Sequence, residues 1–223
     1  MEIRILSVDI ERFNASTRMP FKYGIATMTH LPHVFLRVDV NFDGVNQTGI
    51  SADHLPPKWF TKDPKKDPLE EIEDMLVVIE NAGKLAQMII SDSVFNFWIE
   101  LYQKQDDWAA DSSTPHLLAH FGTSLIERAL IDAFCRQQGR TFANLLQENA
   151  FGIHWDSIRP ELKGKEPKDL FPAPLESITI RHTVGMVDPL TEAEIIEDER
   201  INDGLPQSLE NCIQFYGVNH FKI

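Results

Sequence analysis

The first fifty residues alternate apolar and polar side chains, which is the pattern of half-buried β-strands. The alternation is clearest in residues 3–8 and 34–40. A segment punctuated by proline and glycine, residues 18–24, separates these stretches, and residues 42–44 (Phe-Asp-Gly) have the composition of a turn. We therefore expect a three-stranded antiparallel meander at the start of the chain.

Residues 51–68 break the alternation. This stretch has four prolines, and each disfavours helix at the residue before it. It also carries Trp59 and Phe60, which a simple linker does not need. We therefore expect a loop whose aromatic side chains have a role in packing or in binding.

Helical spacing of apolar residues follows, from Leu69 to Ile89. Asp67 followed by Pro68 is a typical helix start, with acidic residues in the first turns. Further helices are expected over residues 94–102, 115–138 and 141–147, the second of these ending at Gly139. Strands first and helices second predict an α+β domain.

Residues 149–175 interrupt this order, and we interpret them as a long surface connection and a domain boundary. A β-branched strand is then expected over residues 177–185, and a short helix over 205–217 with Pro206 in its first turn. A new strand begins at residues 219–223. This order predicts a β-α-β unit of a parallel sheet.

Composition and charge narrow the classes of function. The 223 residues carry 34 acidic and 21 basic side chains, a formal net charge of −13, which argues against a nucleic-acid or anionic-membrane partner. No apolar run is long enough to span a bilayer, and the charged N-terminus does not resemble a signal peptide. Cys135 and Cys212 make a weak case for a disulfide. We expect a cytoplasmic protein with no membrane partner.

Two motifs could bind a metal ion. His116 and His120 have the i, i+4 spacing of a zinc-binding helix, but Leu117 stands where zincins have glutamate, and no third ligand is apparent nearby. We interpret them as ordinary helix histidines, with a His-ligated metalloenzyme as an open alternative. The acidic residues between 192 and 203 lack the spacing of a calcium-binding loop, so we expect a solvated surface.

Several stretches resemble the mandelate racemase and muconate lactonizing branch of the enolase superfamily. Residues 18–24 (Arg-Met-Pro-Phe-Lys-Tyr-Gly) resemble the segment between the first strands of its N-terminal capping domain. Residues 125–134 and 139–146 resemble its helical pattern of Glu-x-Ala-Leu-x-Asp, a glycine and then a Leu-Leu pair. Residues 202–223 resemble the approach to the second barrel strand. The pieces occur in the family's order over nearly the whole chain.

The resemblance implies an architecture. It is an α+β capping domain, with a three-stranded antiparallel meander followed by a helical bundle, joined to an incomplete (β/α)8 TIM-type barrel of β-α-β only. We assign residues 1–148 to the capping domain, 149–175 to a connecting segment and 176–223 to the start of a truncated barrel domain. A complete barrel takes roughly 250 residues, so the last segment is enough for about one and a half strand–helix units.

The resemblance also implies a chemistry, which is Mg²⁺-dependent removal of a proton α to the carboxylate of a small substrate by a dehydratase, racemase or cycloisomerase. Lys222 matches the first lysine of the family's Lys-x-Lys motif, and it would lower the pKa of the second by like-charge repulsion. That second lysine, the usual base, would follow Ile223, and the family's three carboxylate ligands for Mg²⁺ lie on later strands. We expect this chain to be a fragment that is inactive alone.

In this family, two loops of the capping domain cover the barrel mouth, where they exclude water and select the substrate. The corresponding residues here are about 14–24 and 51–60. The substrate-binding candidates are Phe21, Tyr23, His54, Lys58 and Trp59. The alternative for Phe21 and Trp59 is simple packing of the loops onto the helices. We also expect a homo-oligomer. A non-catalytic interaction protein, pairing its open strand edges with a partner, is the alternative function.

Overall fold

The computed structural model describes residues 1–171 and 173–223 and divides them into two compact units. Unit 1 comprises Met1–Ala15 and Pro32–Pro174, and unit 2 comprises Ser16–Leu31 and Leu175–Ile223. Each unit is described by itself. The assignment of the chain to a capping domain and the start of a barrel stays a prediction.

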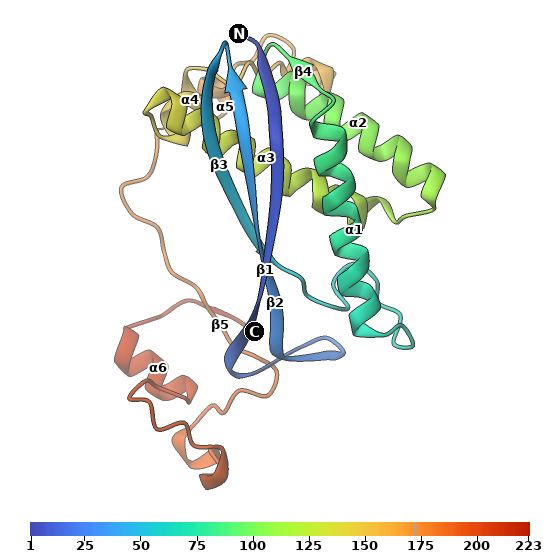
Figure 1. Ribbon diagram of the computed structural model, residues 1–223. Coiled ribbons are helices and arrows are strands. Elements are labelled where there is room, and N and C mark those ends of the chain that lie inside the picture. The colour runs from blue at the N-terminus through green and yellow to red at the C-terminus, as the bar shows by residue number, and fades with distance from the viewer. Residues whose placement is uncertain (172) are drawn as a thin grey trace. The chain divides into compact units, whose positions relative to one another are not determined.

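The sheet contains the predicted meander and one additional short strand. Its order is β3-β2-β1-β4, with β1 at Ile3–Tyr23, β2 at Ala26–Phe42, β3 at Val45–His54 and β4 at Ile90–Ser91 (Figure 1). The outer ends of β1 and β2, residues 16–31, belong to unit 2. The turn between β2 and β3 has positive φ angles at Asp43 and Gly44, as a two-residue hairpin loop requires. The three-stranded antiparallel meander is therefore confirmed.

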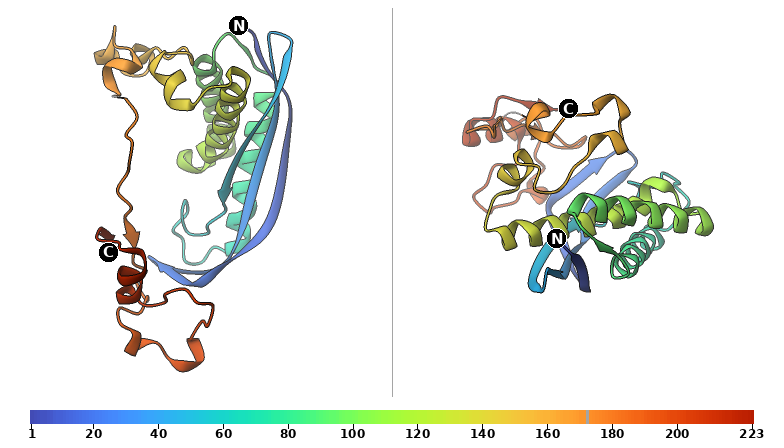
Figure 2. Two further views of the ribbon diagram at one scale, coloured as in Figure 1. Left: turned by 90° about the vertical axis from the view of Figure 1, so that its left-hand side faces the viewer. Right: turned by 90° about the horizontal axis from the view of Figure 1, so that it is seen from above.

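Four helices complete most of unit 1: α1 (Pro68–Ala86), α2 (Val94–Ser112), α3 (His116–Gln138) and α4 (Phe142–Gln147). Figure 2 shows these helices on one face of the sheet. Asp67 caps α1 by accepting a hydrogen bond from the Leu69 N–H, and Gly139 ends α3 in the left-handed conformation, both as predicted. The helical part of the α+β prediction is thus confirmed.

The core lies between the sheet and the helices. Alternate residues of β2, from Val34 to Val40, are fully buried. Gly49 of β3 packs directly on α3, and a Cβ there would lie 2.0 Å from the Ala129 carbonyl oxygen and 2.8 Å from the Ala133 Cβ. The small side chains of Ala129 and Ala133, facing Gly49, therefore let α3 approach β3 closely.

The segment that follows α4 contains three short helices, at Trp155–Ser157, Pro160–Leu162 and Pro167–Leu170 (α5). Trp155 packs against Phe171, with ring centroids 6.2 Å apart. The segment predicted to be a connection thus has local structure of its own.

Unit 2 contains the end of the β1–β2 hairpin and the last 49 residues, Leu175–Ile223. The last 49 residues contain β5 (His182–Thr183), two short helices at Glu192–Glu194 and Glu197–Glu199, α6 (Leu209–Tyr216) and β6 (Phe221–Lys222). β5 and β6 pair in parallel, with His182 opposite Phe221 and Thr183 opposite Lys222. The order β-α-β and the parallel pairing agree with the prediction, whereas the incomplete barrel stays a prediction.

Five predicted boundaries are wrong. The loop expected from residue 51 begins only after His54, because β3 continues its pairing with β2 to His33. β1 runs through Pro20 to Tyr23, and α2 continues past residue 102 to Ser112. In unit 2, the strand expected over residues 177–185 is paired only at residues 182–183, and α6 begins at Leu209 after its cap Ser208 rather than at Pro206. Strand pairing and cap formation, which composition does not fix, set these limits.

None of the helices in the described part of the chain combines the length and the apolarity that a membrane span requires.

Candidate functional site

Unit 2 contains a small cavity of about 190 Å³ between the end of the β1–β2 hairpin and the β5–α6 segment. Its walls are Met19, Pro20, Phe21, His182, Thr183, Val184, Asp188, Gln207, Leu209 and Cys212. A second hollow of about 600 Å³ shares four of these residues, Met19, Pro20, Asp188 and Gln207. The two hollows therefore adjoin along the hairpin, and the smaller one is below the usual size of a ligand pocket.

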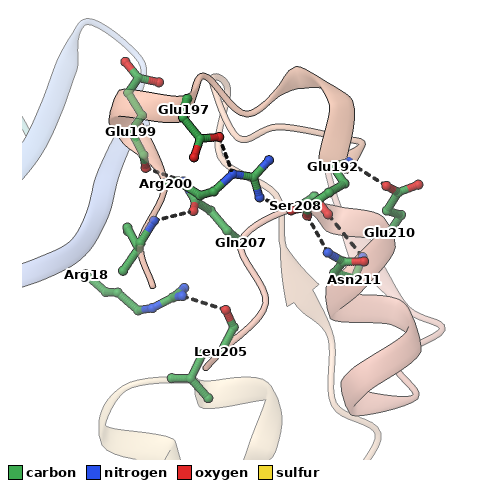
Figure 3. Close-up of polar contacts among 11 residues, drawn as sticks. Arg18, Glu192, Glu197, Glu199, Arg200, Leu205, Gln207, Ser208, Glu210 and Asn211 are labelled. Carbon is green, nitrogen blue, oxygen red and sulfur yellow. Dashed lines mark hydrogen bonds and ion pairs between the residues drawn. The ribbon is translucent and has the colours of Figure 1, made fainter. Parts of the chain in front are cut away.

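Arg18 fixes the hairpin end to the segment before α6. Its guanidinium donates to both carboxylate oxygens of Asp203, at 2.6 and 2.8 Å, and to the carbonyl of Pro206 at 2.9 Å. It also donates to the carbonyl of Leu205 at 2.9 Å (Figure 3). This hydrogen bonding, together with the Leu205 N–H, lowers the pKa of Asp203 to about 2. A planar, bidentate ion pair of this kind fixes the geometry more strictly than a point charge does.

A second arginine organises the acidic surface of unit 2. Arg200 pairs with Glu197 at 3.1 Å and with Glu192, and Asn211 donates to the same Glu192 side chain (Figure 3). These contacts raise the pKa of Arg200. The acidic run is thus tied to α6 by hydrogen bonds and ion pairs, rather than being only a solvated surface.

Two of the predicted site residues are described in unit 2. Phe21 lines the small cavity, and Lys222 is exposed in β6, opposite the cavity residue Thr183. The Val184 N–H donates to the Lys222 carbonyl at 2.9 Å, which fixes the backbone of this strand. The side chain of Tyr23 lies outside the described residues.

The other predicted substrate residues, His54, Lys58 and Trp59, lie in unit 1. His54 is exposed at the end of β3, with its Nδ1 2.8 Å from the Nδ1 of His33, and Trp59 is exposed. Burial, followed by the charge of His54, lowers the pKa of His33. The structure thus divides the candidates between two units, and their binding roles stay predictions.

Lys58 makes a buried ion pair. Its ammonium lies 2.6 Å from the Glu71 carboxylate and also donates to the carbonyls of Asp63 and Lys66. The two side chains are 10% and 5% exposed. Lys58 therefore fastens the loop that follows β3 to the start of α1. The sequence analysis missed Glu71, although its spacing from Met75 and Val78 places it on the buried stripe of the helix.

One group of metal-ligating side chains is found among the described residues, formed by Asp106, His116 and His120 in unit 1. Two of its three donors are imidazole nitrogens, whereas Mg²⁺ prefers oxygen ligands in octahedral geometry. This group does not fit the Mg²⁺ that the family resemblance implies.

No protein-family model matches the sequence, and no curated protein matches it. Among solved structures, similarity is found to an enolase from Bradyrhizobium in complex with magnesium and mandelic acid (16% identity, TM-score 0.45, 66% of this chain and 35% of that one). The chain is also similar to a mandelate racemase/muconate lactonizing enzyme, with 17% identity and a TM-score of 0.46 over 65% of this chain and 34% of that one. A mandelate racemase/muconate lactonizing enzyme-like protein from Rubrobacter xylanophilus is similar at 12% identity, with a TM-score of 0.43 over 65% of this chain and 33% of that one.

The chain spans about a third of the length of these structures. In structure, as in its sequence motifs, it resembles enolases and mandelate racemase/muconate lactonizing enzyme-like proteins.

Proposed function

We propose that this chain is the N-terminal portion of an enzyme of the mandelate racemase and muconate lactonizing branch of the enolase superfamily. The complete protein would remove the α-proton of a small carboxylate substrate with Mg²⁺, as a dehydratase, racemase or cycloisomerase. We also propose that it is a cytoplasmic homo-oligomer. The 223-residue chain by itself would not catalyse the reaction.

The observation that carries this proposal is the ion pair between Arg18 and Asp203. These residues belong to two of the segments on which the sequence resemblance rests, residues 18–24 and 202–223, and they are 185 positions apart. Beside this pair, Phe21 and the end of β5 line the same cavity. A hairpin held over strand ends in this way would exclude water from a substrate and select its shape.

Lys222 would contribute charge to this site. Residues two positions apart on a strand point to the same face, so the next lysine of a Lys-x-Lys motif would share the face of Lys222. Each ammonium would lower the pKa of the other, and Lys222 would offset the negative charge of the substrate carboxylate. Functional residues of barrels lie at the C-terminal ends of the parallel strands, which agrees with a role at this position.

The coding sequence that follows Ile223 provides the first test. The proposal requires a lysine at the second position after Lys222. Strand–helix repeats with three spaced acidic residues should then follow. A different residue, or no further strand–helix repeats, would refute it. Racemisation or α-proton exchange of mandelic acid in D₂O, followed by NMR, then tests the activity of the complete protein.

Two controls separate the parts of the proposal. Lys222→Met in the complete protein should abolish Mg²⁺-dependent exchange, while Lys168→Met, at an exposed lysine paired with Glu166, should leave it unchanged. Exchange by the purified 223-residue chain would contradict the proposed inactivity of this chain alone. Equal loss of activity in both variants would contradict the role of Lys222.

A non-catalytic interaction protein is the second candidate, and the apolar surface of unit 2 favours it. Ile178, Ile180 and Phe215 are 81%, 70% and 62% exposed. Exposed apolar side chains beside a short parallel pair of strands are typical of an interface with another chain. Light scattering after size-exclusion chromatography tests this, because a monomer at every concentration would contradict both the interaction surface and the homo-oligomer.

A further inference from the structure

Two helices of unit 1 bring three metal-ligating side chains together. Asp106 comes from α2, and His116 and His120 come from α3. The Asp106 Oδ1 lies 2.8 Å from the His116 Nε2 and 3.4 Å from the His120 Nε2, and the three ligand atoms all lie within 4.8 Å of one another. Both histidines thus face the carboxylate with their Nε2 atoms.

Rigid elements hold these side chains in place. His116 and His120 are one turn apart on α3, so they project from the same side of the helix. The connection from α2 to α3 is short, with Ser113 in the left-handed conformation and the Thr114 N–H donating to the Ala109 carbonyl at 2.9 Å. This tight reversal places the last turns of α2 beside the first turns of α3.

Neighbouring side chains fix the orientation of His120, the less exposed of the two histidines. The His120 Nδ1 lies 3.2 Å from the hydroxyl of the buried Thr123, which leaves its Nε2 facing Asp106. The Tyr102 ring stacks on the His120 ring with centroids 3.7 Å apart and planes 7° from parallel, and its hydroxyl lies 3.4 Å from the His116 Nε2. A hydrogen bond to the second ring nitrogen is the usual support of a metal-binding histidine.

The cluster is accessible from solvent. The His120 side chain is only 12% exposed, but His116 and Asp106 are 61% and 45% exposed. An ion could therefore enter from the surface and keep water at its remaining position. Three protein ligands and one open position are the arrangement of many zinc sites.

The donor types and spacing select the kind of ion. Zn²⁺ binds imidazole nitrogen and carboxylate oxygen at about 2.0–2.1 Å, so ligand atoms of a tetrahedral site lie about 3.3 Å apart. The two separations from the Asp106 oxygen, 2.8 and 3.4 Å, lie on either side of this value. We propose that Asp106, His116 and His120 form a binding site for a divalent transition-metal ion of the Zn²⁺ type, which links α2 to α3.

This proposal is independent of the proposed enzyme activity. The spacing of His116 and His120 alone favours ordinary helix histidines, because no third ligand is apparent nearby along the chain. The structure supplies that ligand from the neighbouring helix, ten residues before His116. Because Asp106 belongs to a different helix from the two histidines, no sequence motif joins the three ligands.

Calorimetric titration of Zn²⁺ into the metal-free chain tests the proposal. We expect one ion per chain in the wild type, and binding at least about tenfold weaker after His116→Ala or Asp106→Asn, since each removes a ligand of three. His30→Ala, at an exposed histidine of unit 2, is the control and should bind as the wild type does. Circular dichroism verifies that each variant is folded.

Cobalt provides a second readout, because its visible spectrum reports which kinds of atom bind the ion. Co²⁺ bound by nitrogen and oxygen has only weak visible bands, whereas a thiolate ligand from Cys135 or Cys212 would add an intense charge-transfer band. Saturable Co²⁺ binding without that band, lost in the Asp106→Asn variant, supports the site. No uptake of Zn²⁺ by the wild type, unchanged uptake by both ligand variants, or a thiolate band would overturn it.

Discussion

Two buried helix glycines of unit 1 allow the closeness of helix packing to be tested with one chemical change. Gly122 lies in α3 and Gly83 in α1, and both are buried. Replacement by alanine should favour helix by about 1 kcal/mol at each position. The surroundings of the added methyl group differ, and we expect this difference alone to decide the outcome.

At Gly122, the added Cβ would lie 2.2 Å from the carbonyl oxygen of Val78 and 2.7 Å from its carbonyl carbon. These atoms belong to the backbone of α1, so they cannot rotate away, and the two helices would have to separate by on the order of 1 Å. Overpacking of a core costs typically about 1–3 kcal/mol and sometimes more. Because the clash is with backbone atoms, we expect a cost at the upper end of this range, about 3 kcal/mol. After the gain of about 1 kcal/mol in helix propensity, Gly122→Ala should lower the free energy of unfolding by about 2 kcal/mol.

At Gly83, the added Cβ would meet only side-chain atoms of Val8, at 3.2 to 3.7 Å. A side chain can shift by a few tenths of an ångström, so the crowding and the propensity gain should nearly cancel. We expect Gly83→Ala to change the free energy of unfolding by less than about 1 kcal/mol.

Urea denaturation followed by circular dichroism measures both free energies of unfolding, and equal m-values would show that the unfolded states are comparable. We expect Gly122→Ala to be clearly the less stable of the two variants. If both variants are equally stable, or if Gly122→Ala is stabilised, the close approach of α1 and α3 does not govern this position.

Three further predictions concern charged groups. Lys58→Met should lower the free energy of unfolding in urea by about 3–5 kcal/mol, because it leaves the buried Glu71 carboxylate without its partner, and an unchanged value would refute the ion pair. Burial raises the pKa of Glu127 to about 7, above its ordinary value of 4.5, so its contribution to stability is full below about pH 4.5 and is lost as the pH rises through 7. Glu127→Gln should therefore be more stable than the wild type by up to about 3 kcal/mol at pH 8 and by little at pH 4.5, and parallel pH profiles would contradict this. The Asp203 carboxylate should stay ionised until the pH falls through about 2, and Arg18→Met should raise its pKa in a carbon-13 NMR titration; an unchanged titration would exclude the ion pair.

Local signals explain which parts of the fold could be predicted. Asp67 caps α1 through its own side chain, and Gly139 and Gly217 end their helices because they adopt positive φ angles. These preferences act within a few residues, so the sequence alone contains them. The meander was predictable for the same reason, since the alternation of β2 is visible along one stretch of chain.

Long-range pairing explains what could not be predicted. β1 continues through Pro20 because β2 lies beside it, although proline and glycine in residues 18–24 favour an interruption. Arg18 and Asp203 meet across most of the chain, and Asp106 joins the histidines of another helix. No periodicity or local motif connects such residues, so the geometry of the candidate sites came only from the structure.

The buried ion pair of unit 1 affects how the predicted substrate residues should be ranked. For Lys58 to bind a substrate carboxylate, its ammonium would have to leave Glu71, which is only 5% exposed. Breaking a buried pair on one side costs about 3–5 kcal/mol, which a substrate carboxylate would have to offset. Phe21 already lines a cavity in unit 2. A role for Phe21 in substrate selection is therefore energetically easier to reconcile with this structure than a role for Lys58.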